Sequence, residues 1–110
     1  MYSVRDLSKM TDIFRENVHG IKTLYLFGSY ARGDERQWSD LDIAVIVQRR
    51  PEGIERRNLL NALYKKLREN NIAADIVFRP ADEFEMNKNI PVTLSHTIAT
   101  EGKVLWKTGD

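Results

Sequence analysis

The heptapeptide LDIAVIV at residues 41–47 constrains the fold of this chain more than any other stretch. It is apolar at nearly every position, which predicts a β-strand that is buried on both faces. A sheet with helices on each side provides that cover. Two further apolar runs, IKTLYLF at residues 21–27 and AADIVF at residues 73–78, predict other strands of the same sheet, the later one closed by Pro80.

Helices are predicted on either side of these strands. Apolar residues recur every three or four positions over residues 4–18, with Ser3 and Asp6 as a candidate cap and Gly20 as a stop. Further helices are expected over residues 29–32 and 53–69. A last helix is expected from Pro91 to Gly102, with Ile90, Leu94 and Ile98 as its core stripe, and a short segment over residues 104–106 follows it. The order predicts an α/β (α+β) fold with a central mixed sheet flanked by helices, and residues 1–110 as a single domain.

Composition narrows the possible functions. Hydrophobic residues make up 42% of the chain, and 17 basic residues nearly balance 16 acidic ones, so a dedicated nucleic-acid-binding protein is disfavoured. No cysteine is present, which excludes disulfides and thiolate metal sites. The first 20 residues contain no apolar run of signal-peptide or membrane length. We therefore expect a soluble, cytoplasmic domain.

Asp40 and Asp42 stand at the beginning of the most apolar strand. Side chains alternate along a strand, so these two carboxylates share a face with Ala44 and Ile46. Like charges placed side by side repel, and a divalent cation such as Mg²⁺ relieves that repulsion by taking carboxylate oxygens as ligands. The alternative is structural: Asp40 caps a turn and Asp42 pairs with a basic residue.

Two further features add to this pair. Asp75 is a lone carboxylate in the third apolar run, and it joins the same cluster if the third strand lies beside the second; otherwise it is a solvent-facing residue at a strand end.

Gly28 and Ser29 follow the first strand, where glycine permits close approach of a ligand and the following helix amides can hold phosphate oxygens. Taken alone, Gly-Ser is more often a simple turn.

The combination of these features resembles the signature of the DNA polymerase β-like nucleotidyltransferases, and most closely that of the minimal nucleotidyltransferase (MNT) family. The stretch GSYARGDERQWSDLDIAV places Gly-Ser ten residues before Asp-x-Asp at the start of an apolar strand. Arg32-Gly33, Ser39, Asp75 and the ending IATEGKVLW are also similar to the family pattern, so the resemblance covers essentially the whole chain. Trp38 departs from it, because it is bulkier than expected in that loop.

The resemblance implies a role for each matching residue. Gly28 and Ser29 bind the nucleotide phosphates, and Arg32 is a further candidate, with a solvated helix position as its alternative. Asp40 and Asp42 hold Mg²⁺ or Mn²⁺. Asp75 completes the metal site and is the candidate to accept the proton of the attacking hydroxyl. Phosphoryl-group chemistry depends mainly on positioning and charge neutralisation, which agrees with these roles.

The implied activity is transfer of a nucleoside monophosphate, AMP from ATP, to a hydroxyl. Family members of this size stand beside a HEPN-domain protein as the antitoxin of a toxin–antitoxin pair, so a hydroxyl of a HEPN toxin is the expected acceptor. Two alternatives stay open at this point: a non-catalytic antitoxin that acts by binding, and an enzyme for a small-molecule hydroxyl. The choice of nucleotide, the number of monophosphates transferred and the oligomeric state are also left open.

Overall fold

The computed structural model describes residues 1–37 and 39–109, so Trp38 and the expectation about its loop lie outside the described residues. Four strands form one mixed sheet in the order β3-β2-β1-β4. β2 runs antiparallel to β1 and parallel to β3, and β1 runs antiparallel to β4. The strands are β1 (Ile21–Phe27), β2 (Leu41–Val47), β3 (Ala74–Pro80) and β4 (Lys103–Lys107).

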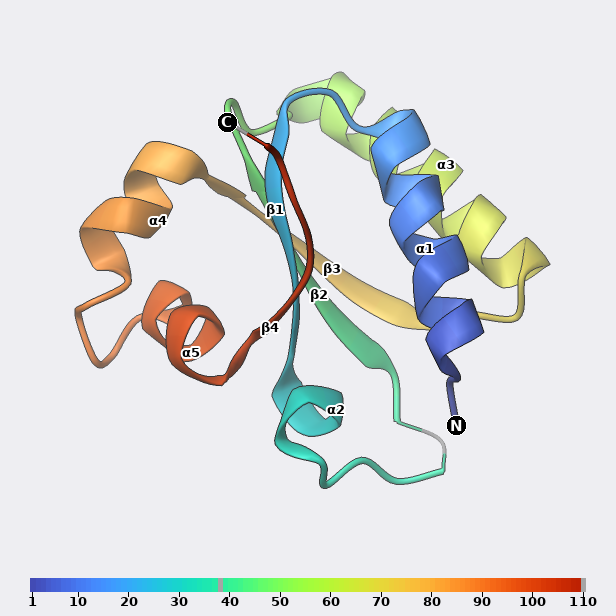
Figure 1. Ribbon diagram of the computed structural model, residues 1–110. Helices are drawn as coiled ribbons and strands as arrows, with labels where there is room; N and C mark the ends of the chain where they lie inside the picture. Colours follow the sequence, from blue (N-terminus) through green and yellow to red (C-terminus); the bar gives the residue numbers. More distant parts are fainter. Residues whose placement is uncertain (38, 110) are drawn as a thin grey trace.

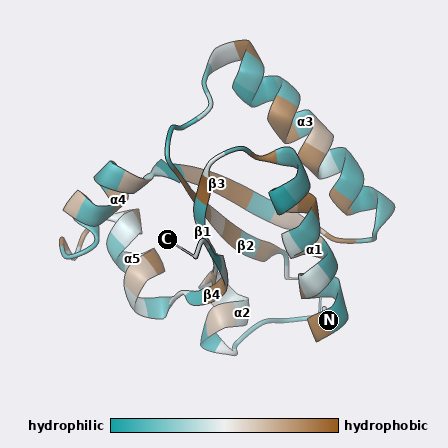
Figure 2. Cartoon of the chain, turned by 45° about the horizontal axis from the view of Figure 1, so that its top comes forward, coloured by the Kyte–Doolittle hydropathy of each residue, from teal (hydrophilic) through white to brown (hydrophobic). Residues whose placement is uncertain are grey.

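Helices cover both faces of the sheet, as Figure 1 shows. α1 (Val4–Asn17) and α3 (Gly53–Glu69) pack on one face, and α4 (Ala81–Asn87) and α5 (Leu94–Glu101) pack on the other. β2 is the reason for this arrangement, because its side chains alternate between two apolar clusters. Leu41, Ile43 and Val45 enter the α1/α3 cluster, while Ala44 and Ile46 enter the α4/α5 cluster. Figure 2 shows β2 as largely hydrophobic along its length.

Local features of the backbone mark the ends of α1 and α2. Ser3 and Asp6 form a reciprocal capping box at the start of α1, as the sequence predicts. The short helix α2 (Gly28–Arg32) begins directly at the end of β1 and ends at Gly33, whose φ of 79° is left-handed. α3 has the bounds expected from its apolar stripe. The mixed sheet with helices on both faces confirms the expected fold class.

The sequence prediction was wrong or incomplete around the last two helices. α4 was not predicted, and α5 begins at Leu94 rather than Pro91 because the Thr93 side chain accepts a hydrogen bond from the His96 amide, 3.1 Å away. Ile98 is fully buried, but Ile90 precedes the helix and is 44% exposed, so it is not part of a core stripe. β3 extends two residues past the predicted end, to Pro80.

Among residues 1–37 and 39–109, no helix combines the length and the apolar character that crossing a membrane requires.

Candidate active site

The structure places Asp42 and Asp75 side by side on one face of the sheet. β2 and β3 are parallel neighbours, and their register pairs Asp42 with Asp75. Residues paired in this way point to the same side, here the side covered by α4 and α5, since Ala44 is buried there. Asp42 is half-buried, whereas Asp75 is exposed on the edge strand. The sequence interpretation that brought these two aspartates together is therefore supported by the register.

The electrostatics of Asp42 show that Asp40 lies within range of the same cluster. Partial burial raises the pKa of the Asp42 carboxyl above its usual range, and the negative charges of Asp75 and Asp40 raise it further. Arg32 acts in the opposite direction and lowers the pKa of the same carboxyl. Asp40 itself precedes β2 and is exposed. A half-buried carboxylate near two like charges is unfavourable in the absence of a cation.

Gly28 lies directly against Asp42, a contact that sequence reasoning did not anticipate. β1 and β2 are antiparallel, and Phe27, the last residue of β1, pairs with Asp42. Gly28 follows with a left-handed φ of 71°, and a β-carbon at this position would overlap Oδ2 of Asp42 and lie 2.8 Å from its Cγ. Only glycine fits here while the carboxylate keeps its place. The Gly-Ser turn and the Asp-x-Asp pair thus form one site.

The first turn of α2 presents backbone amides next to these carboxylates. Phe27, at the N-cap, provides no side-chain hydrogen bond to this turn. The first amides of a helix have no acceptor within the helix, so they are available to a ligand. Ser29 is half-buried in this turn, and its carbonyl oxygen accepts the Asp34 amide at 3.0 Å, which closes the other end of α2. Anionic oxygen atoms fit such a turn.

Arg32 lies at the last turn of α2, where two carboxylates contact its guanidinium. Its Nε donates to Asp34 Oδ2 at 3.2 Å, and Nη1 lies 3.7 Å from Glu101 Oε2 on α5. The side chain is 45% exposed, so neither ion pair holds it strongly. Arg32 is therefore positioned near Asp42 and free to exchange partners with a bound anion.

The donor set fits a hard divalent cation that is shared with a substrate. Among the described residues, no three acidic, histidine or cysteine side chains already lie close enough together to hold a metal ion. Mg²⁺ does not need such a cage, because it usually binds one or two carboxylates and takes its other ligands from water and substrate phosphates. Carboxylates at positions 40, 42 and 75 offer the oxygen ligands that this ion prefers, beside a turn suited to phosphates.

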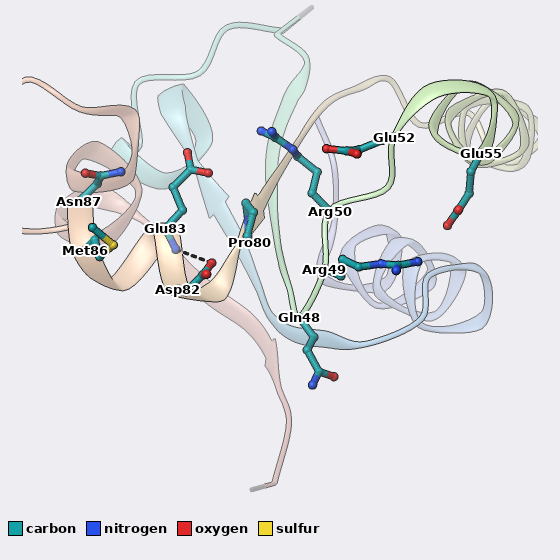
Figure 3. Close-up of a pocket in the computed structure, with 10 residues that line it drawn as sticks. All are labelled: Gln48, Arg49, Arg50, Glu52, Glu55, Pro80, Asp82, Glu83, Met86 and Asn87. Atoms are coloured by element: carbon teal, nitrogen blue, oxygen red, sulfur yellow. Dashed lines mark hydrogen bonds between the residues drawn. The ribbon is translucent and has the colours of Figure 1, made fainter.

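The other end of β2 and β3 contains a different kind of surface. A cavity of about 610 Å³ lies there, between the segment after β2 and the helix after β3. Figure 3 shows Arg49 and Arg50 on one side of it and Asp82 and Glu83 on the other. The two arginines are exposed, as expected for a solvated face. None of the predicted site residues lines this cavity.

Comparison with known proteins gives the family. The model of the polymerase β nucleotidyltransferase family matches residues 8–110. The chain belongs to this family. Among individual members, the protein adenylyltransferase MntA of Shewanella oneidensis is 29% identical over 101 residues, a stretch that covers 92% of this chain. The chain spans 65% of the length of MntA, which is less than two thirds.

Solved structures agree with this family assignment. A toxin–antitoxin crystal structure with AMP-PNP superposes with a TM-score of 0.68 and 28% identity, covering 94% of this chain and 74% of the other. The tri-AMPylated Shewanella oneidensis HEPN toxin in complex with the MNT antitoxin gives a TM-score of 0.61 and 25% identity, covering 94% and 71%. Both similar structures therefore cover nearly the whole chain.

Proposed function

We propose that this chain is a Mg²⁺-dependent nucleotidyltransferase that moves AMP from ATP to a hydroxyl of a HEPN-domain toxin and so acts as its antitoxin in the cytoplasm. The observation that carries the proposal is the meeting of the Gly28 turn with Asp42 and Asp75 at one end of the sheet. Support for the acceptor comes from the relatives, since MntA is a protein adenylyltransferase and one similar structure holds an AMPylated HEPN toxin.

Nucleotide binding is assigned to the turn after β1. The amides at the start of α2 and the Ser29 hydroxyl hold the β- and γ-phosphates of ATP, and Gly28 begins this turn while leaving room for the Asp42 carboxylate beside it. Arg32 releases its exposed ion pairs with Asp34 and Glu101 and contributes a positive charge to the phosphates. These three residues orient the triphosphate so that its α-phosphorus faces the carboxylates.

Transfer is assigned to the three aspartates. Asp40, Asp42 and Asp75 hold Mg²⁺, or Mn²⁺ in its place, which when bound neutralises phosphate charge as it builds up during transfer. The acceptor oxygen forms a bond to the α-phosphorus, and the bond between that phosphorus and the oxygen leading to the β-phosphate breaks, releasing pyrophosphate. Asp75 is exposed on the edge strand, where the acceptor can reach it, and takes the proton from the attacking hydroxyl.

The test is to incubate the protein with labelled ATP, Mg²⁺ and the HEPN-domain partner and to follow the mass of the partner. We expect the wild-type protein to add AMP, and the Asp42→Asn protein to bind the partner without modifying it. A partner that stays unmodified, yet is neutralised equally by both proteins, would establish the non-catalytic antitoxin instead. The same incubation is repeated with a cell extract in place of the partner. Label that then appears on a small molecule, with none on the partner, would establish the small-molecule enzyme.

A further inference from the structure

The outer edge of β3 lies open beside Asp75. β3 is the last strand of the sheet, and among residues 1–37 and 39–109 only β2 pairs with it. An edge strand presents main-chain N–H and C=O groups that can pair with a further strand. Because Asp75 belongs to this strand, a chain that pairs with the edge passes directly beside it.

The register of β2 and β3 determines which main-chain groups of β3 point outward. The Leu41 amide donates to the Ala73 carbonyl at 3.0 Å, and in a parallel pair this bond repeats at every second residue. The residues between these point away from β2, and they are Ala74, Ile76 and Phe78. A second observation agrees with this pattern. Nη1 of Arg79 donates to the Phe78 carbonyl at 2.8 Å, as expected for a carbonyl that is turned away from β2.

A groove of about 390 Å³ shows that this edge is accessible. It runs between β3 and the beginning of α3, and four consecutive β3 residues line it, from Ile76 to Arg79. Side chains alternate across a strand, and those of Ile76 and Phe78 are buried in the α1/α3 cluster. The main chain of these two residues therefore lines the groove. Free donors and acceptors at the spacing of a strand match a peptide main chain.

The carboxyl end of β3 limits where a segment can pair. Arg79 occupies the Phe78 carbonyl, and Pro80 has no N–H to donate. The outward groups that remain are the N–H and C=O of Ala74 and Ile76 and the N–H of Phe78. Ala74 and Ile76 stand on either side of Asp75 in the strand. Pairing along this edge is thus concentrated around the carboxylate that is proposed to take the proton.

A row of register partners across the sheet leaves the acceptor a place opposite the phosphate turn. Phe27, Asp42 and Asp75 are partners on neighbouring strands, and Gly28 follows Phe27. A residue beside Asp75 on an added strand continues this row, with its side chain on the same face at about 5 Å. In an in-line displacement the entering and leaving oxygens occupy opposite sides of the phosphorus. With the triphosphate at the β1 end of the row, the open edge is left for the entering hydroxyl.

We infer that an extended segment of the partner protein pairs with the outer edge of β3 as an added strand and presents the acceptor hydroxyl to Asp75. The inference rests on the proposed transfer to a protein and adds to it how the acceptor is held. The segment carries a serine, threonine or tyrosine beside Asp75. Main-chain pairing fixes the position of the segment along the edge, and alternation along the segment fixes the face to which this side chain points.

Hydrogen exchange tests the pairing directly. Amide exchange is measured on the protein with and without the HEPN-domain partner, and nucleotide is omitted so that no transfer occurs. The Ile76 and Phe78 amides should exchange at least tenfold more slowly in the complex, and the amides of β4, the other edge strand, should keep their rates. Unaltered exchange of Ile76 and Phe78 in the complex would overturn the inference. Protection of the same amides by self-association would also overturn it, because a second copy would then occupy the edge.

An introduced cysteine tests the groove independently, since the chain contains no other. Arg56→Cys places a thiol on an exposed position of α3 that lines the groove, and Lys65→Cys is the matched control on an exposed position of the same helix outside it. Both proteins are assayed before and after reaction with a bulky polyethylene glycol maleimide. Before labelling, each should transfer AMP as the wild type does.

Labelling of Arg56→Cys should raise the KM for the partner protein at least tenfold and leave the affinity for AMP-PNP with Mg²⁺ unchanged. Labelling of Lys65→Cys should change neither. A labelled Arg56→Cys protein with unaltered partner KM would overturn the inference. If wild-type protein transfers nothing, the proposed function fails by itself. Amide exchange in the complex then decides whether the partner pairs with this edge, and a partner that does not bind at all overturns both.

Discussion

The two ends of the parallel strand pair β2 and β3 differ in how charge is arranged. At the amino end, Asp42 is half-buried beside two other aspartates, and its pKa is raised by burial and by their charges. At the carboxyl end, a 610 Å³ cavity is lined by arginines and by carboxylates, so it contains charges of both signs. All of these charged residues are exposed or nearly so. Exposed charges of mixed sign are stable in water without a ligand. The unbalanced cluster, rather than the roomier hollow, marks the candidate site.

The direction of β1 explains why the site forms at the amino end. Ligands of open sheets with parallel strands usually bind at the carboxyl ends of those strands. Here β1 runs antiparallel to β2, so the carboxyl end of β1 meets the amino end of β2. The Gly-Ser turn at the end of one strand is thereby joined to the aspartates at the start of the next two. One antiparallel neighbour thus places the candidate site at the end of the sheet opposite to the usual one.

The largest effect is expected from removing one charge at the amino end. Asp42→Asn should lower the rate of AMP transfer roughly 1,000-fold, equivalent to about 4 kcal/mol, because a central oxygen ligand for Mg²⁺ is lost. The matched change at the carboxyl end, Asp82→Asn, should leave the rate within about twofold. Rates are measured with labelled ATP and the HEPN partner. Equal rates for the two variants would contradict the assignment of the candidate site to the amino end of β2 and β3.

Glycine at position 28 is expected to matter nearly as much. In Gly28→Ala the β-carbon displaces the Asp42 carboxylate, and a misplacement of about 1 Å at a reacting centre costs roughly 100-fold in rate. Gly53→Ala is the control at the carboxyl end: it too has a positive φ, 58°, but its β-carbon meets nothing within 4 Å. Both variants should lose about 1–2 kcal/mol of stability from the left-handed backbone, measured by urea unfolding. Transfer that is equally slow in both would mean that backbone strain alone is responsible.

The raised pKa of Asp42 predicts an effect of pH on stability in metal-free protein. A carboxyl whose pKa is higher in the folded state than its ordinary value of 3.8 binds more protons when folded. The stability that this raised pKa contributes to the folded state is therefore fully present at low pH. It is lost as the pH rises from about 3.8 through the pKa of the folded state. At neutral pH without Mg²⁺, Asp42→Asn should have a higher midpoint of thermal unfolding than the wild type.

Addition of Mg²⁺ should reverse that order. At ten times its dissociation constant, a ligand that binds only the folded state adds about 1.4 kcal/mol to the free energy of unfolding. The wild type should gain this stability and Asp42→Asn should not, in a thermal scan at pH 7. If Mg²⁺ leaves the unfolding midpoint of the wild type unchanged, the aspartate cluster does not bind this ion.

Part of this architecture could be predicted from the sequence, because it depends on local pattern. The apolar runs define β1 and β2 with their observed bounds, and the stripe over residues 53–69 defines α3. α4 was missed because its apolar content is small: Phe84 is buried, but Met86 is 76% exposed, so no helical stripe is visible. Its available signal was Pro80 followed by Asp82 and Glu83, which favours a helix start.

The site was only partly predictable, for a related reason. Alternation along β2 placed Asp42 on the correct face, but its neighbours depend on register between strands. Asp75 joins Asp42 only because β2 and β3 are parallel and in step, and Gly28 contacts Asp42 only because β1 is antiparallel. Strand direction and register are properties of the packed sheet, and no local pattern in a single strand specifies them.

The smallest effect is expected at the carboxyl end. Replacing both Arg49 and Arg50 with alanine should leave the rate of AMP transfer, the KM for ATP and the KM for the partner within about twofold, because both side chains are exposed and solvated. Arg32→Ala, a single change beside Asp42, should instead raise the KM for ATP roughly tenfold, since a charged hydrogen bond to a phosphate contributes about 1.5 kcal/mol or more. Steady-state kinetics with the purified partner measure all three quantities. A folded double variant with a tenfold higher KM for the partner would mean that the partner reaches the carboxyl end of the sheet, because nothing that binds ATP at α2 contacts these arginines. That result would make the 610 Å³ cavity part of the surface that recognises the partner. The two ends would then differ only in that the transfer step takes place at the amino end.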